Sequence, residues 1–597
     1  MTLLPATAGA RADRRHHLSP ALVAAMLATA IVLAMEAARG FPGVANFGGD
    51  NDSLLRMVEI RDLLAGQDWF DLTQYRLGLD GGTAMHWSRL IDAPIAALIL
   101  LVAWLTGSVS VGEGVAAAVW PALTYAVSLY FLVRAAERLG GEQAVLPAAV
   151  IGGICLYSIA IFQPGMIDHH NVQFALTVAT ISLLLDAEDR AARALPAGIT
   201  AGLSIAIGME TAPSIASIGA AVGLLYLVRG GRSGKVAASF GVGFAATGLA
   251  VLVLTLPAAH WRMEACDAFS AVQFWVMVIG GLGLAASTIP AALNETMARR
   301  AVGLGCVALA IVAVLAVFFP QCLAAPLSDL DPRQKIYWLD SIHEAQSAWS
   351  ALMLEPVPAM GRLATPLLAL TVMVVAAYRR GASAAGVLVG IPLLASVMVT
   401  AWQIRGGAFA AGLAVIPLAA WVGAWRAEAS SGVPAQLKMV AAWLLSINLV
   451  WSGFAQAFVA AGKPAEAAAS ENECLRASDY ALLNTLPAAT VLSGINQGSS
   501  ILAFTRHRAL AGPYHRNVGN IAAYEAISSE PERARKILID SGVSLIAVCR
   551  AFDENPGLAP DTLHARVTRG DSPTWLQIVP ASKGQPIEIY TVVPTAG

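Results

Sequence analysis

Long apolar runs, separated by short polar segments, fill the first 460 residues of the chain. An α-helix needs roughly 20 apolar residues to cross a bilayer. Thirteen runs reach or approach that length, near 19–38, 114–133, 144–162, 172–186, 195–209, 213–228, 236–256, 271–293, 301–318, 363–378, 384–402, 406–425 and 438–458. The pattern predicts an α-helical polytopic membrane protein with about thirteen transmembrane helices.

Basic residues cluster at alternate ends of these runs. The clusters are Arg14 and Arg15, Arg134 and Arg138, Arg190 and Arg193, Arg229, Arg232 and Lys235, Arg299 and Arg300, Arg379 and Arg380, and Arg426 and Lys438. Cytoplasmic loops carry the excess of Lys and Arg in membrane proteins. The clusters therefore predict a cytoplasmic N-terminus and an external C-terminal segment. The first run is long enough to be an uncleaved span rather than a signal peptide.

A shorter apolar run, Ala93–Leu105, does not fit this alternation. If it crossed the bilayer, every later basic cluster would move to the wrong face. We therefore expect it to lie in or dip into the outer interface, within a long first external loop from 40 to 112. A second long external loop is expected from 319 to 362, which completes a transmembrane domain from 1 to 460.

Beyond residue 460 the apolar runs give way to mixed elements. Helix-like stretches at 477–484, 521–528 and 530–541 alternate with strand-like stretches at 490–493, 544–549 and 587–592. Such alternation is typical of a small α/β fold. We predict an extracytoplasmic α/β domain from 461 to 597.

Composition agrees with a membrane protein and counts against one class of partner. The chain is 57% hydrophobic and 13% charged, with a net charge of −2. This balance leaves no surplus of Lys and Arg over acidic residues, which argues against a nucleic-acid partner because phosphate binding depends on a basic surface. Of the six cysteines, Cys155 and Cys306 lie in apolar runs and are expected to be inert core residues, whereas Cys474 and Cys549 could pair in an oxidising compartment.

Candidate chemistry lies in three segments that the topology puts on the outer side. Asp168, His169 and His170 stand at the lip of an apolar run, where charged or ligating groups are costly and point to function. The first loop contains Gly49-Asp50-Asn51-Asp52 and Met85-His86-Trp87-Ser88-Arg89, and the second long loop contains Ser341-Ile342-His343-Glu344. Three such segments on one face predict a site.

The order of these motifs resembles the catalytic subunit of oligosaccharyltransferases, and the Asp-His-His form is most similar to the archaeal branch. The resemblance runs from about residue 20 to 520 and implies a GT-C fold with a polyprenyl-linked sugar donor. It implies that Asp52, Asp168, His170 and Glu344 bind a divalent metal, with Asp52 and Glu344 also catalytic and orienting the acceptor. Oxygen ligands with one imidazole suit Mg²⁺ or Mn²⁺, and the imidazole favours Mn²⁺. Asp50 competes with Asp52 for this role, and His169 and His343 would be neighbours. Arg405 matches the arginine that contacts the donor phosphate.

One family motif is missing. The Trp-Trp-Asp-Tyr-Gly sequence that reads the acceptor sequon would follow the strand at 490–493, where this chain has Gly494-Ile495-Asn496-Gln497-Gly498-Ser499. Discriminating a hydroxyl group requires placed polar partners, which are absent here. We expect a non-sequon acceptor, a lipid, a glycan or a hydroxyl. Residues that could face it are Asp50, His86, Arg89, His515 and Arg516.

The sequence thus predicts a glycosyltransferase of the bacterial inner membrane that works at its outer face, with membrane lipid around it. Two other functions stay open: a protein oligosaccharyltransferase with a divergent acceptor site, and a lipid-linked sugar transporter or flippase. Two local alternatives stay open as well. Asp168 and His170 could simply cap the helix that begins near Asn171, and Arg405 could anchor a helix end at the headgroups.

Overall fold

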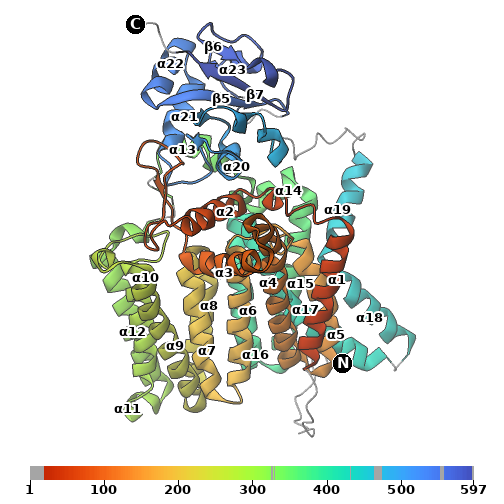
Figure 1. The fold of residues 1–597 in the computed structure, drawn as a ribbon. Coiled ribbons are helices and arrows are strands. Elements are labelled where there is room, and N and C mark those ends of the chain that lie inside the picture. The colour runs from red at the N-terminus through yellow and green to blue at the C-terminus, as the bar shows by residue number, and fades with distance from the viewer. Residues whose placement is uncertain are drawn as a thin grey trace.

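The computed structural model describes residues 19–324, 327–328, 330–429, 432–462, 474–551, 555 and 557–593. Arg11, Arg14 and Arg15 lie outside the described residues, and so do the side chains of Ser341 and His343. Within these ranges the chain forms a helix bundle with a small α/β domain above one of its ends (Figure 1).

Twelve of the thirteen predicted runs each form one main helix. They are α1 (Pro20–Ala38), α4 (Val109–Gly140), α5 (Val145–Ser158), α6 (His170–Ala187), α7 (Ala194–Ile207), α8 (Ala212–Arg229), α9 (Gly231–Thr255), α10 (Ala271–Ser287), α12 (Met297–Phe318), α15 (Pro356–Arg380), α16 (Ala384–Trp402) and α17 (Gly407–Glu428). By length and composition, nine helices among the described residues could cross a membrane, or ten if a bent pair is one span. The chain is therefore a multi-pass membrane protein.

The helices differ in how far they are buried. The span that contains α17 is 83% buried and forms the centre of the bundle, whereas α12 buries only Arg300 and Gly303. Cys306 on α12 is exposed, so the expectation that it is a core residue is wrong. The α12 sequence is apolar because the surface of this helix faces membrane lipid rather than the protein core. Cys155 is buried as expected.

The last predicted run, 438–458, is not one straight helix. It is divided between α18 (Val433–Ser446) and α19 (Asn448–Gly462), which are bent by 76°. Ile447 has extended backbone angles at the break. Polar side chains provide other bonds there: Ser446 Oγ donates to Ala442 O at 2.6 Å, and Asn448 Nδ2 donates to Ser158 Oγ at 2.6 Å.

The first long loop forms two helices, α2 (Asn51–Leu64) and α3 (Arg89–Thr106), joined through the short strands β1 (Thr73–Gln74) and β2 (Thr83–Ala84). Although α3 is long and apolar enough to span a membrane, Figure 1 draws α2 and α3 across the end of the bundle rather than alongside its helices. This position agrees with the expectation for Ala93–Leu105. The second long loop contains α13 (Pro332–Tyr337) and α14 (Ala348–Leu354).

The C-terminal segment forms a five-stranded sheet in the order β4-β3-β5-β7-β6. Its strands are β3 (Thr490–Leu492), β4 (Arg508–Ala509), β5 (Val543–Cys549), β6 (Leu576–Ile578) and β7 (Ile587–Val592), with α20 (Gly498–Phe504), α21 (Gly519–Ser528), α22 (Pro531–Asp540) and α23 (Leu563–Thr568). The three predicted strands are present. The helix expected at 477–484 is instead two short 3₁₀ turns, a correction to that prediction.

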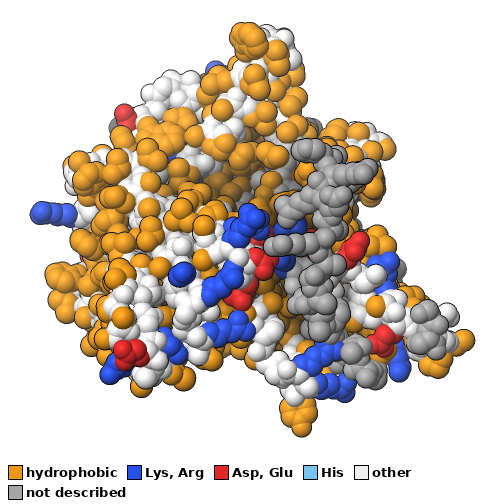
Figure 2. Space-filling model, turned by 90° about the horizontal axis from the view of Figure 1, so that it is seen from below, with side chains coloured by type: hydrophobic (Ala, Val, Ile, Leu, Met, Phe, Trp, Pro, Cys, Tyr) orange, Lys and Arg blue, Asp and Glu red, His pale blue; other side chains and the backbone are white. Residues whose placement is uncertain are grey.

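Two disulfides lie near this end of the molecule. Cys474 pairs with Cys549, as the sequence allowed, and Cys266 pairs with Cys322, which the sequence did not indicate. At the opposite end, Lys and Arg side chains gather near the centre of the face in Figure 2. Near the C-terminal ends of α4 and α6, Arg134 at 3.2 Å, Arg193 at 2.9 Å, and Arg138 surround the carboxylate of Asp186.

Candidate functional site

Close backbone packing brings the two acidic segments together. Gly48 and Gly165 have positive φ angles of 71° and 98°, which favour glycine. A Cβ atom on Gly165 would lie 2.3 Å from Gly43 O, and one on Gly48 would lie 2.6 Å from the sulfur of Met166. The approach continues along the chain, because Ile167 N donates to Ser53 Oγ at 3.1 Å. The start of α2 is thereby held against the segment that precedes α6.

Asp52, Asp168 and His170 meet at this contact, and we call them the acid site. Their ligand atoms all lie within 4.8 Å of one another. Asp50 has a different place: it caps α2 by accepting from Ser53 N at 2.8 Å. The structure thus brings Asp52, rather than its competitor, into the group with Asp168 and His170.

The alternative that Asp168 simply caps α6 is correct for only one of its two carboxylate oxygens. Asp168 Oδ1 accepts from His170 N at 3.1 Å, near the start of α6. Asp168 Oδ2 lies 3.8 Å from His170 Nε2. The carboxylate is almost fully buried, so one edge orders the backbone while the other faces the acid site.

Crowded negative charge shapes the electrostatics of the first turn of α2. Burial and the nearby Asp168 raise the pKa of Asp50 to about 6. Burial, followed by repulsion from Asp50 and Asp168, raises the pKa of Asp52 well above its usual value. Buried carboxylates without enough opposite charge favour a proton or a cation. The donor set therefore fits a divalent metal ion.

Glu344 and Arg405 lie on neighbouring segments. Glu344 is exposed and is near enough to act electrostatically on Asp52 and His170. The backbone joins the two segments, because Ile404 N donates to Gln346 O at 2.8 Å. Arg405 itself is exposed in the 3₁₀ turn Ile404–Gly406. Glu344 also lines a pocket together with Arg362, a cation that the sequence interpretation did not select.

A buried group of charged side chains lies next to His169, and we call it the brace. Its members are Arg56, Glu59, Arg89 and Asp92. Arg56 is fully buried and donates to Asp92 Oδ1 at 2.8 Å and to Glu59 Oε2 at 3.4 Å. Arg56 Nη2 lies 3.4 Å from His169 Nδ1, and the centre of the guanidinium lies 4.6 Å from the centre of the Trp87 ring. If Arg56 donates to Nδ1, the proton of a neutral His169 is on Nε2. The brace therefore orients His169.

Glu210 is a site neighbour that sequence reasoning assigned no role. Its Oε1 lies 3.6 Å from His169 Nε2, and its Oε2 accepts from Gln173 Nε2 at 3.1 Å. The available signal was an acid in the short connector between two apolar runs, a place where a charged group is costly. Its partners are spread over the sequence, and only the fold brings them together.

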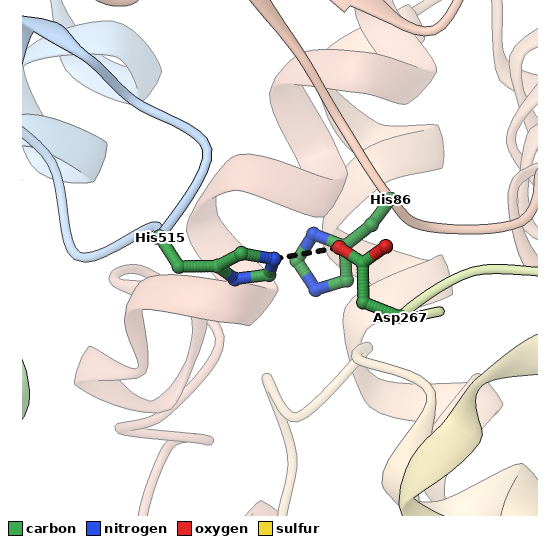
Figure 3. Close-up of side chains that lie close together, drawn as sticks. All are labelled: His86, Asp267 and His515. Carbon is green, nitrogen blue, oxygen red and sulfur yellow. Dashed lines mark hydrogen bonds and ion pairs between the residues drawn. The ribbon is translucent and has the colours of Figure 1, made fainter. Parts of the chain in front are cut away.

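The residues expected on the acceptor side have different surroundings. Arg89 is buried in the brace, where it donates to Asp92 Oδ2 at 3.1 Å and to Gln67 Oε1 at 2.9 Å. His86 and His515 instead lie beside Asp267, in the connector between α9 and α10 (Figure 3). Arg516 also donates to Asp267, from its Nε to Oδ2 at 2.8 Å. We call His86, Asp267 and His515 the histidine clasp.

The bundle, the loop helices across its end and the α/β domain above them form a GT-C fold of the oligosaccharyltransferase type. No protein-family model and no curated protein matches the chain. Solved structures do match. The oligosaccharyltransferase of Archaeoglobus fulgidus in its apo form has a TM-score of 0.66 and 15% identity, over 89% of this chain and 69% of that one.

Two further oligosaccharyltransferase structures from Archaeoglobus fulgidus agree. The complex of AglB with an inhibitory peptide and a dolichol-phosphate has a TM-score of 0.65 and 14% identity, over 89% of this chain and 69% of that one. The form tethered to an acceptor peptide with the NVT sequon has a TM-score of 0.63 and 14% identity, over 97% of this chain and 74% of that one. At such identities the likeness establishes the fold alone.

Proposed function

We propose that the protein is a metal-dependent membrane glycosyltransferase. It transfers a sugar or oligosaccharide from a polyprenyl-phosphate or polyprenyl-pyrophosphate donor to a non-sequon acceptor, such as a lipid, a glycan or a hydroxyl. The single observation that carries this proposal is the acid site, where Asp52, Asp168 and His170 come within 4.8 Å of one another at the starts of α2 and α6 in a GT-C fold.

Asp52, Asp168 and His170 would hold a Mn²⁺ or Mg²⁺ ion, and Glu344 would complete the set from the second long loop. Such an ion supplies Lewis-acid stabilisation to negative charge on donor phosphate oxygens. Carboxylate oxygens with one imidazole match the preferences of these ions. Asp52 and Glu344 would also orient the acceptor, because they come from different loops and Glu344 is near enough to act electrostatically on Asp52. A solved oligosaccharyltransferase of this fold contains Zn and sulfate.

Arg405 would bind the donor phosphate. It is exposed, and the hydrogen bond from Ile404 N to Gln346 O at 2.8 Å ties its turn to the Glu344 loop. Arg362 lines the pocket beside Glu344 and would add a second guanidinium. Guanidinium groups suit phosphate oxygens because their N–H donors match two oxygens at once. A structure of this fold contains dolichol-phosphate, which is a polyprenyl carrier.

We place the site at the outer face of the bacterial inner membrane, with the N-terminus in the cytoplasm. Disulfides persist in oxidising compartments, and both disulfides lie on segments at the α/β end of the molecule. The basic residues gathered in Figure 2 lie at the other end, as cytoplasmic residues would.

The acceptor assignment follows from the segment that replaces the sequon motif. Gly494–Ser499 forms a 3₁₀ turn and the first residues of α20. Ser499 Oγ lies 2.9 Å from Tyr514 OH, which donates to Asn51 O at 2.9 Å. This segment therefore contacts the loop that carries Asp52, but it presents no tryptophan pair or acid to read a sequon.

The test compares glycolipid and glycoprotein profiles of a deletion strain that carries wild-type protein, Asp168→Asn, Arg405→Gln or Arg426→Gln. Arg426 is the matched control because it lies at the other end of α17. We expect wild-type protein and Arg426→Gln to restore a glycan on lipid or polysaccharide, and the other two variants to fail. Full restoration by Asp168→Asn would contradict the enzyme assignment. Loss of glycans only from sequon-bearing proteins would contradict the acceptor assignment.

A further inference from the structure

A second group of ligating side chains lies outside the proposed catalytic set. His86 comes from the connector between β2 and α3, Asp267 from the connector between α9 and α10, and His515 from the C-terminal domain. Each offers a ligand atom within 4.8 Å of the other two. In Figure 3 the rings of His86 and His515 stand beside the Asp267 carboxylate, and the two ring centres are 4.7 Å apart.

One buried nitrogen of the clasp has no hydrogen-bond partner among the described residues. His515 Nε2 lies 2.6 Å from Asp267 Oδ2, so these two groups are already partners. His86 Nδ1 is buried and has no hydrogen-bond partner among the described residues. A buried polar atom without a partner destabilises the fold, because it has lost water and gained no other bond. An orphaned imidazole nitrogen beside a second imidazole and a carboxylate is what a metal ligand set shows before the ion binds.

We propose that His86, Asp267 and His515 bind one zinc-class transition-metal ion that fastens the C-terminal domain to the membrane domain. Two imidazoles and one carboxylate form a three-residue set that leaves one position for water. Ligand atoms around a tetrahedral zinc ion lie about 3.3 Å apart, so small side-chain rotations close the set. Imidazole ligands favour zinc-class ions, whereas the acid site favours Mn²⁺ or Mg²⁺.

Arg516 gives the clasp a second state without metal. Its Nε and Nη2 donate to Asp267 Oδ2 and Oδ1 at 2.8 and 2.6 Å. A carboxylate has about four lone-pair sites, so Asp267 can retain Arg516 while one oxygen turns to the ion. The guanidinium charge nevertheless opposes a nearby cation. Arg516 therefore lowers the affinity of the clasp, and neutralising it raises that affinity.

The ion would order the aromatic side chains of Trp87 and Tyr514, which lie beside the proposed active site. Trp87, next to His86, has its ring centre 5.5 Å from that of Tyr514, next to His515. Trp87 also lies 5.8 Å from the ring of His169, and Tyr514 OH donates to Asn51 O. The metal clasp and the acid site thus share a layer of aromatic side chains. The metal assignment itself does not depend on transfer activity.

The test measures Zn²⁺ binding to the purified full-length protein in detergent after chelation, in an Asp168→Asn background that disables the acid site. Equilibrium dialysis and titration calorimetry give stoichiometry and affinity with Zn²⁺ alone. We expect one bound equivalent, at least 100-fold weaker binding in His86→Asn and His515→Asn, and unchanged binding in His260→Asn. His260 is the matched control, because it is exposed in the same α9–α10 connector and outside the clasp.

Arg516→Gln makes the test independent of folding defects. If the three residues bind metal, this variant binds Zn²⁺ about 10-fold more tightly, and Zn²⁺ raises its Tm more than that of its parent. A misfolded protein cannot gain affinity in this way. If the residues form only an ion-pair contact, Arg516→Gln binds Zn²⁺ no better than its parent. That result, or equal Zn²⁺ binding by His86→Asn, or no saturable binding at all, would overturn the proposal.

Discussion

The acid site and the histidine clasp are both groups of three ligating residues, but their charge and support differ. The acid site combines two carboxylates with one imidazole, close to a third carboxylate, Asp50. The clasp combines one carboxylate with two imidazoles, and Arg516 already neutralises that carboxylate. The first group has unbalanced negative charge, while the second is almost balanced without an ion.

Their supports differ as well. The acid site joins two loops of the membrane domain, held by glycine packing at Gly48 and Gly165 and by the buried brace around Arg56. The clasp joins the membrane domain to the C-terminal domain, and Asp267 is fixed by the neighbouring disulfide of Cys266. A preorganised, charge-rich group is suited to chemistry, whereas a neutral group between domains is suited to holding them together. The predictions test that difference.

The largest effect is expected from Asp52→Asn, compared with Asp50→Asn. Removing a group placed to stabilise transition-state charge costs about 10²–10³ in rate, so Asp52→Asn should reduce transfer by that factor in membranes that contain the native donor. Asn caps helices as well as Asp does, so Asp50→Asn should keep its bond to Ser53 N and stay within a few-fold of wild type. An equal loss in both variants would show that the two acids share one role and that only their joint charge matters.

The second prediction concerns the support of the clasp. Cys266→Ser with Cys322→Ser removes a link between residues 56 positions apart. Losing a native disulfide costs about 2–4 kcal/mol, which thermal unfolding would record as a lower Tm. We also expect weaker Zn²⁺ binding at the clasp, because Asp267 follows Cys266 directly, and unchanged Mn²⁺ binding at the acid site.

The other disulfide provides the matched control. Cys474→Ser with Cys549→Ser removes a link within the C-terminal domain, between residues 75 positions apart. It should lower the Tm by a similar amount without changing Zn²⁺ affinity. If both pairs of substitutions weaken Zn²⁺ binding equally, the Cys266 disulfide has no specific part in holding Asp267.

The apolar pattern predicted most of the helices, and the order of the motifs predicted the three residues of the acid site. Apolar length gave the helices, because a bilayer imposes the same length on every span. Apolar length did not predict the bend at Ile447. At that bend Ser446 donates to Ala442 O within α18, and Asn448 donates to Ser158 on α5. The resemblance placed Asp52, Asp168 and His170 together, since each belongs to a recognisable motif. Glu210 and Asp267 belong to no motif. Their partners are brought near by tertiary packing, which no local pattern encodes.

The smallest expected effect concerns the brace, whose charge state can be tested by pH. Burial and the nearby Asp92 raise the pKa of Glu59 from 4.5 to about 8. Between these values the folded protein holds a proton that the unfolded chain has released, so stability falls as pH rises. The slope is at most about 1.4 kcal/mol per pH unit. Glu59→Gln removes this slope, and its Tm should exceed that of wild type most at pH 9 and least near pH 5.

Glu59→Gln also tests whether the brace and the acid site are independent. Gln retains a polar group beside Arg56, and Arg56 keeps its 2.8 Å bond to Asp92. The position of His169 should therefore be preserved, and Mn²⁺ affinity measured at pH 9, where Glu59 of the wild-type protein is ionised, should change by less than a few-fold. A parallel fall in Mn²⁺ affinity would mean that the charge of the brace reaches the acid site through Arg56 and His169. In that case the two groups form one electrostatic unit, and the contrast with the nearly neutral clasp becomes sharper.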